Sequence, residues 1–253
     1  YQTVSGKGIK AAYKNKTILV GNRLFMNDSK IQTNQIENQI QKLESEGKTV
    51  VLVAYDKKII GLIAIADTLK EFSKEAVSEL KKMGKEVWMI TGDNERTANA
   101  IAQQLSIDNV MAEILPQDKA KKVKELQEKG KIVAAVGDGI NDAPMLAQAD
   151  VGIAVGAGTD IAKETGGIVL IKNDLRDVVT AIDLSKKTVS KMKQNLFWAF
   201  FYNVALIPVA AGLLYPFGIL LNPIFAAIAM ASSSITVVGN AMLLNRYKAR
   251  IQN

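Results

Sequence analysis

The sequence predicts an α/β protein with a doubly wound parallel sheet, followed by a helical hairpin that spans a membrane. Two observations support this fold class. From residue 67 onward, short apolar runs alternate with segments of helical periodicity, the pattern of a parallel sheet covered by helices. From Asn195 to Asn245 no charged residue occurs in 51 positions. That length holds two crossings of about 20 residues each.

Composition limits the chemistry that is open to this chain. It has 32 Lys and Arg against 25 Asp and Glu, which gives a net charge of +7, and it contains neither Cys nor His. Disulfides, thiolate nucleophiles and imidazole bases are therefore excluded, and carboxylates, Lys, Tyr, Met, hydroxyls and amides remain. The basic residues are not interleaved with aromatic ones, so the charge favours an anionic membrane surface over nucleic acid as a partner.

Residues 1–66 are expected to form part of a small α+β domain. Short β-prone runs are separated by glycine turns at Gly6–Gly8 and Gly21–Asn22, which taken alone are ordinary hairpin turns. The other expected elements are an amphipathic helix at residues 33–46 with Gly47 as its C-terminal cap, and two antiparallel strands at residues 50–55 and 59–66.

The alternating region supplies the expected parallel sheet. We expect strands at residues 87–90, 109–112, 132–136, 151–155 and 168–171, and helices at residues 73–83, 95–105 and 116–129. The run Ile132–Val136 is apolar throughout, which predicts a fully buried strand. Parallel strands meet at one edge with their carboxyl ends, so the polar residues that follow them are expected to gather there.

Two carboxylates follow the run that ends at Val136, in the sequence Val-Gly-Asp-Gly-Ile-Asn-Asp. Asp138 and Asp142 lie on this glycine-rich turn. Paired carboxylates at the end of a strand suit a hard divalent cation such as Mg²⁺ with a bound phosphate. The alternative is an ordinary strand-to-helix loop whose acidic residues cap the helix.

Two further polar groups are expected at the same edge. Thr91-Gly92-Asp93 ends another strand, and its backbone N–H groups can hold phosphate oxygens. Lys119 lies near the start of a helix, where a cation is unfavourable against the helix dipole. A phosphoryl group would give this lysine a partner, and the alternative is a solvated lysine on a basic helix.

The uncharged C-terminal stretch predicts two crossings, at about residues 195–214 and 223–244. A polar-to-amphipathic helix at residues 174–193 precedes them, basic residues flank both crossings, and the connecting loop contains none. By the positive-inside rule both ends of the hairpin are cytoplasmic. The alternative is a buried hairpin of a soluble protein.

A few polar side chains lie inside these crossings. They are Tyr202 and Asn203 in the first and Met230, Ser233 and Ser234 in the second. Serines commonly pack membrane helices against each other. An amide in hydrocarbon needs a partner, however, and a Met thioether is a soft ligand suited to Cu(I).

The motifs together resemble those of the P-type ATPases. Thr91-Gly-Asp93, Leu115-Pro-x-Asp-Lys119 and Gly137-Asp-Gly-x-Asn-Asp142 occur in this order ahead of a membrane hairpin. Gly6-x-Gly8 and Gly21-Asn22 look like the nucleotide-domain signature of the heavy-metal subfamily. Tyr202-Asn203 and Met230-x-x-Ser233-Ser234 resemble the membrane motifs of its Cu(I) exporters, and the resemblance covers essentially the whole chain.

The resemblance implies three domains and their roles. Residues 1–66 would be the C-terminal part of a nucleotide-binding domain, 67–180 a haloacid-dehalogenase-like phosphorylation domain, and 181–253 a linker and two transmembrane helices. The implied ATP site contains Gly6, Gly8, Gly21 and Asn22. The implied catalytic residues are Thr91, Gly92, Asp93, Lys119, Asp138, Asn141 and Asp142, and Asp138 and Asp142 would also hold Mg²⁺. Part of a Cu(I) site would be formed by Tyr202, Asn203, Met230, Ser233 and Ser234. The implied partners are the lipid bilayer and a copper chaperone.

Several hallmarks of that family do not occur in this sequence. They are the Asp-Lys-Thr-Gly-Thr segment with the nucleophile, the His-Pro pair of the nucleotide domain, the Cys-Pro-Cys of the membrane helices, and the actuator domain. Each would precede Tyr1, so the sequence is expected to be the C-terminal portion of a pump. It is expected to be inactive without the remainder of its chain.

Three alternatives remain at this point. The pump could carry Zn²⁺ or another divalent metal, although the second crossing offers Met and Ser and no carboxylate. The chain could be a non-catalytic, membrane-anchored subunit that binds nucleotide or metal. It could also be a soluble phosphatase, which the long uncharged tail disfavours.

Overall fold

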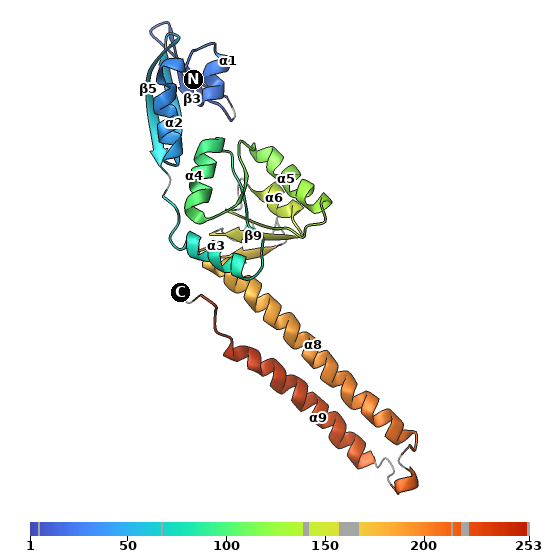
Figure 1. Cartoon of the computed structure of the whole chain (residues 1–253). Coiled ribbons are helices and arrows are strands. Elements are labelled where there is room, and N and C mark those ends of the chain that lie inside the picture. Colours follow the sequence, from blue (N-terminus) through green and yellow to red (C-terminus); the bar gives the residue numbers. More distant parts are fainter. Residues whose placement is uncertain are drawn as a thin grey trace. The chain divides into compact units, whose positions relative to one another are not determined.

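The computed structural model describes residues 1–4, 6–66, 68–138, 142–156, 167–213, 215–218 and 223–251 (Figure 1). Two compact units divide the chain, Tyr1–Arg176 and Asp177–Asn253. The boundary falls at the start of the long helix α8, four residues before the expected end of the phosphorylation domain.

The first part of unit 1 is a five-stranded antiparallel sheet in the order β1-β2-β3-β4-β5. Its strands are β1 (Gln2–Val4), β2 (Gly8–Tyr13), β3 (Lys16–Gly21), β4 (Lys48–Tyr55) and β5 (Lys58–Ala66), and its helices are α1 (Arg23–Asp28), η1 (Asn34–Ile36) and α2 (Glu37–Ser45). Alternate residues of β4 are buried, and its core side chains pack with Met26 and Ile40 from the helical segment. The α+β architecture predicted for residues 1–66 is therefore confirmed.

The second part of unit 1 alternates strands and helices as expected. Its strands are β6 (Trp88–Ile90), β7 (Asn109–Met111), β8 (Ala134–Gly137), β9 (Val151–Val155) and β10 (Ile168–Leu170), and its helices are α3 (Ser73–Lys82), α4 (Glu95–Leu105), α5 (Pro116–Glu128) and α6 (Ala143–Gln148). All described strand pairs here are parallel. Val123, Leu146 and Ala154 form the centre of a core between α5, α6 and β9.

The parallel strands form two pieces instead of one sheet. β8, β9 and β10 make one piece, and β6 and β7 make the other. Within the described residues, β8 pairs only with β9 and β6 only with β7. Each of these strands therefore has one backbone edge without a neighbour.

The prediction of a fully buried strand at Ile132–Val136 is wrong. Ile132 lies before β8 and is 89% exposed, while Val136 is 36% exposed. Ala134 and Val136 lie on the same face of β8, and both are exposed, whereas Ala135 on the opposite face is buried. One face of this strand is therefore uncovered by the described residues.

Unit 2 is a helical hairpin. It contains α8 (Arg176–Ala210), η2 (Tyr215–Phe217), α9 (Pro223–Met242) and η3 (Leu243–Arg246). α8 and α9 lie side by side (Figure 1), joined by hydrogen bonds from Asn240 Nδ2 to Asn195 Oδ1 at 2.7 Å and between the hydroxyls of Tyr202 and Thr236 at 3.2 Å. The expected polar helix and first crossing are thus one continuous helix.

Within the described part of the chain, one helix is long and apolar enough to cross a membrane, and it spans Ala227–Arg246. It agrees with the second expected crossing. The first expected crossing lies in the C-terminal half of α8, whose apolar segment ends with the helix at Ala210 and contains the polar Asn203.

A buried carboxylate joins the two ends of the hairpin. Asp183 is 7% exposed and accepts bonds from the hydroxyl of Tyr247 and the ammonium of Lys187, each at 3.1 Å. Burial opposes ionisation of Asp183, but these two hydrogen bonds hold its pKa below the ordinary value. The side chain is therefore a carboxylate at neutral pH and fixes the segment after η3 to α8.

Candidate active site

The central contact of the candidate site is an ion pair between α5 and the loop before α6. Lys119 Nζ lies 2.8 Å from Asp142 Oδ1, and the two side chains are 18% and 15% exposed. Pro116 occupies the first turn of α5 and places Lys119 one position beyond that turn. A cation near a helix N-terminus is opposed by the helix dipole, and the Asp142 carboxylate offsets this unfavourable interaction.

Glycine at position 137 makes room for Asp142. A Cβ atom at Gly137 would lie 2.6 Å from Asp142 Oδ2 and 2.7 Å from its Cβ. No side chain fits there, so the carboxylate folds back onto the end of β8. Asp138 is exposed beside it and has no hydrogen bond or ion pair to any described residue. Asn141, predicted as a member of this loop, lies outside the described residues.

The Thr91-Gly92-Asp93 turn lies at the end of β6, as predicted. Thr91 Oγ1 donates to Asp93 Oδ2 at 2.8 Å, and the Asp93 N–H donates to Thr91 Oγ1 at 3.2 Å. The turn is bonded to the loop that leads into α5, through Ile114 N to Thr91 O at 3.0 Å and Glu113 N to Asp93 O at 2.8 Å. The structure therefore connects this turn directly to the segment that carries Lys119.

A contact that the sequence analysis missed positions Asp93. Thr49, at the start of β4, donates its hydroxyl proton to Asp93 Oδ1 at 3.1 Å. Each oxygen of the Asp93 carboxylate thus accepts a bond from a different threonine. The only signal in the sequence was a polar residue at the start of an apolar strand, which is too common to single out.

A second missed feature is an ion-pair network around a buried glutamate. Glu44 in α2 is 5% exposed and lies 3.2 Å from Arg23 and 3.1 Å from Arg96. Arg96 belongs to α4, so the network ties residues 1–66 to the helix that follows Asp93. Thr97, fully buried, adds a hydrogen bond to the carbonyl of Lys48 at 3.0 Å.

The four residues predicted for a nucleotide site form one cluster. Gly8 pairs with Gly21 across β2 and β3, and a Cβ at Gly8 would lie 2.2 Å from the carbonyl oxygen of Val20. Asn22 donates from Nδ2 to the Gly6 carbonyl at 3.0 Å and caps α1 through Oδ1. Asn22 is therefore a helix cap and not part of a hairpin turn. The motifs Gly6-x-Gly8 and Gly21-Asn22 lie together and form one corner that is lined by backbone atoms.

The five predicted Cu(I) ligands are not gathered in this structure. Tyr202 bonds Thr236, Asn203 donates to its own helix at Ala199 O at 2.7 Å, and Met230 is 68% exposed. Ser234 donates to the Met230 carbonyl at 3.3 Å, and Ser233 is partly exposed. Among the described residues there is likewise no group of three or more His, Cys, Asp or Glu able to hold a metal.

Comparisons with known proteins agree with the family that the sequence motifs indicate. The profile of the haloacid dehalogenase-like hydrolases matches residues 2–150. The probable copper-exporting P-type ATPase of Archaeoglobus fulgidus is 56% identical over 248 residues, which are 97% of this chain and 30% of that protein. The probable copper-transporting ATPase PacS of Synechocystis is 49% identical over 251 residues, 98% of this chain and 34% of that protein.

A solved structure extends the likeness to three dimensions. A zinc-transporting PIB-type ATPase in its E2.Pi state matches with a TM-score of 0.69 and 35% identity, over 96% of this chain and 38% of that one. This chain thus spans about a third of the length of its relatives. It belongs to the haloacid dehalogenase-like hydrolase family. Within that family it is a portion of a heavy-metal P-type ATPase.

Proposed function

We propose that the chain is the C-terminal part of an ATP-driven Cu(I) exporter that works through an aspartyl-phosphate intermediate. The observation that carries this proposal is the pairing of Lys119 with Asp142 against Gly137, the residue before the exposed Asp138. A cation and two carboxylates at one strand end supply what a phosphoryl-transfer site needs, because catalysis there rests mainly on positioning and on neutralising charge.

The acceptor carboxylate would come from a strand outside this sequence. The edges of β6 and β8 that are unpaired among the described residues support a place for that strand. A further parallel strand beside β8 would satisfy its backbone groups. Its carboxyl end would then lie at the same edge as Asp138 and Thr91.

The residues at this edge fit Mg²⁺. Asp138 is exposed and unpaired among the described residues, Asp142 is fixed by Lys119, and carboxylate oxygens are the donors this ion prefers. When bound, Mg²⁺ supplies charge neutralisation for the phosphoryl oxygens. Lys119 adds a second positive charge. Thr91 donates its only hydroxyl proton to Asp93, so it must exchange that bond to reach a phosphoryl oxygen.

We assign ATP binding to the backbone-lined corner formed by Gly6, Gly8, Gly21 and Asn22. Its support is the close approach of the two backbones at Gly8 and Gly21, where a side chain would intrude. A surface made of backbone lets the rings of a nucleotide pack closely against it.

Cu(I) is favoured over Zn²⁺ as the transported ion. The curated relatives named as copper pumps are 46–56% identical to this chain, whereas the solved zinc pump is 35% identical. Met230 also offers a soft sulfur, and the described hairpin offers no carboxylate within the uncharged stretch. A non-catalytic subunit is disfavoured because the phosphoryl-binding residues are present and paired.

The membrane arrangement is part of the proposal. Residues of about 195–214 and 223–244 form two crossings, with unit 1 and the C-terminus in the cytoplasm and residues 215–218 outside. The basic residues on either side of the uncharged stretch support this orientation. The lipid bilayer, the remainder of the pump chain and a copper chaperone are the proposed partners.

The intact pump provides the test. Asp138→Asn is expected to lower Cu(I)-stimulated ATP hydrolysis by about 100-fold, because a charged ligand of the metal is lost. Asp108→Asn is the matched control, since Asp108 is exposed and pairs only with Lys81. An unchanged rate in the Asp138 variant would overturn the catalytic assignment, and a rate that rises with Zn²⁺ but not with Cu(I) would overturn the choice of ion.

A further inference from the structure

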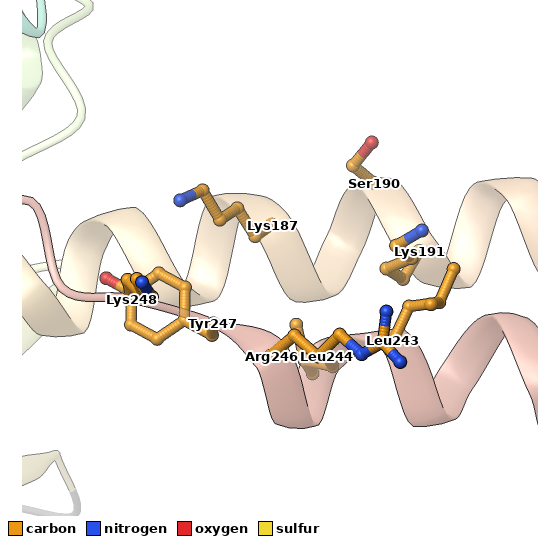
Figure 2. A pocket seen from close by; sticks show the side chains of 8 residues that line it. All are labelled: Lys187, Ser190, Lys191, Leu243, Leu244, Arg246, Tyr247 and Lys248. Atoms are coloured by element: carbon orange, nitrogen blue, oxygen red, sulfur yellow. The ribbon is translucent and has the colours of Figure 1, made fainter.

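A pocket of about 420 Å³ lies between α8 and the end of the α9–η3 segment (Figure 2). Four basic side chains line it, Lys187 and Lys191 from α8 and Arg246 and Lys248 from the chain after α9. No carboxylate is among its lining residues. The nucleotide and phosphoryl sites lie in unit 1, so this pocket belongs to neither of them.

Most of this positive charge is not neutralised by the residues that the structure describes. Lys187 pairs with Asp183, but Lys191 bonds only the neutral oxygens of Asn240 at 2.8 Å and Gln194 at 3.2 Å. Arg246 and Lys248 make no ion pair with any residue that the structure describes. Four cations around one pocket, with one carboxylate among their partners, indicate an anionic ligand.

The place of the pocket identifies the kind of anion. Lys191 lies just before the uncharged stretch that begins at Asn195, and Arg246 directly follows its last residue. Basic residues at that border lie at the level of lipid headgroups. Leu243 and Leu244 line the same pocket and offer it an apolar side. A ligand that combines a phosphate with an apolar body suits both parts of this lining.

We propose that this pocket binds the phosphate-bearing headgroup of an anionic phospholipid in the cytoplasmic leaflet. The proposal rests on the membrane orientation given under the proposed function. Basic pockets between membrane helices on the cytoplasmic side are suited to such headgroups. The lipid phosphate would bridge α8 and the segment after α9, and so would hold the two ends of the hairpin together.

The test measures phosphatidylglycerol binding to the intact pump in vesicles of phosphatidylcholine with increasing phosphatidylglycerol. Arg246→Gln with Lys248→Gln is expected to weaken binding about 30-fold, because each removed side chain takes away a charge-assisted contact with the bound phosphate worth about fivefold. The matched control is Lys186→Gln with Lys193→Gln. It removes two exposed charges from α8 that do not line the pocket. At physiological ionic strength such exposed charges are screened, and the control is expected to change binding by less than about twofold.

Several results would overturn the proposal. Equal loss in the two double variants would mean general attraction to the surface, and no loss in either would mean that another part of the pump covers the pocket. Inorganic phosphate that competes fully with the lipid would make this a free-phosphate site. If the double variant proves unstable, Lys248→Glu alone, at an exposed position, must still weaken binding.

Cu(I)-stimulated ATP hydrolysis in detergent separates this proposal from the proposed function. The Arg246 and Lys248 variant is expected to keep that activity. Loss of lipid binding with normal hydrolysis supports the pocket, whereas hydrolysis missing from the unaltered pump contradicts the proposed function whatever the lipid result is.

Discussion

Asp93 shows how a single side chain is fixed at this site. Its two carboxylate oxygens accept hydrogen bonds from Thr91, in its own turn, and from Thr49, in the antiparallel sheet. Under the proposed function Thr91 releases its bond when it turns towards a phosphoryl group, and Thr49 keeps its own. Thr49 is therefore a positioning residue that keeps Asp93 in place while the bond of Thr91 is exchanged.

Thr49→Val tests this role, because valine keeps the shape and removes the hydroxyl. We expect turnover of ATP by the intact pump to fall about tenfold, since one hydrogen bond to a charged group is worth about 1.5 kcal/mol. Thr49→Ser restores the hydroxyl and is expected to restore most of the rate. A purely structural role would instead lower the melting temperature of the valine variant and leave its turnover unchanged.

At the scale of elements, α2 and α4 are joined through Glu44. The sequence predicted both helices but not their contact, because a glutamate in an amphipathic helix is usually solvated. Here it is 5% exposed and lies between Arg23 and Arg96. Two cations share this buried carboxylate, and Glu37 is a second, more exposed partner at 3.3 Å from Arg23 and 3.9 Å from Arg96.

Glu44→Gln is expected to lower the free energy of unfolding by about 1 to 2 kcal/mol. The value is below that of a fully buried pair because the two arginine side chains are 34% and 45% exposed. Thermal unfolding should show a decrease in melting temperature of about 2–8 °C. The control is Glu46→Gln, whose side chain is 42% exposed and pairs with Lys48. Equal decreases in both variants would contradict a special role for Glu44.

The elements that the sequence predicted well are those whose pattern is local. The helix at residues 95–105 begins at Asn94, whose side chain caps it, and it ends one residue before Ser106. The strand after Ile132 was misjudged because burial depends on what covers each face of the sheet, which no local pattern reveals. The contacts of Thr49 and Glu44 were missed for the same reason, since each joins residues more than 40 positions apart.

At the scale of the whole molecule, the hairpin bears on the path that the chain takes through the bilayer. Two observations favour a hairpin that crosses the bilayer twice. Two polar pairs of the uncharged stretch bond α8 to α9, Asn240 with Asn195 and Tyr202 with Thr236. The connection at residues 215–218 is exposed and uncharged, as a short external loop can be.

The absence of cysteine from this chain makes its path directly measurable. Single cysteines at Phe217, in the connection, and at Lys57, in the β4–β5 turn, are introduced into the intact pump with its other cysteines replaced. In whole cells a membrane-impermeant maleimide should label Phe217→Cys, which is 77% exposed in the hairpin. Lys57→Cys should react only after permeabilisation, because the proposed ATP site places unit 1 in the cytoplasm. Lys248→Cys is expected to behave like Lys57→Cys, since two crossings return the chain to its starting side. Labelling of Phe217→Cys only in permeabilised cells would mean that the hairpin does not cross, and the uncharged stretch would then need a surface other than the bilayer core.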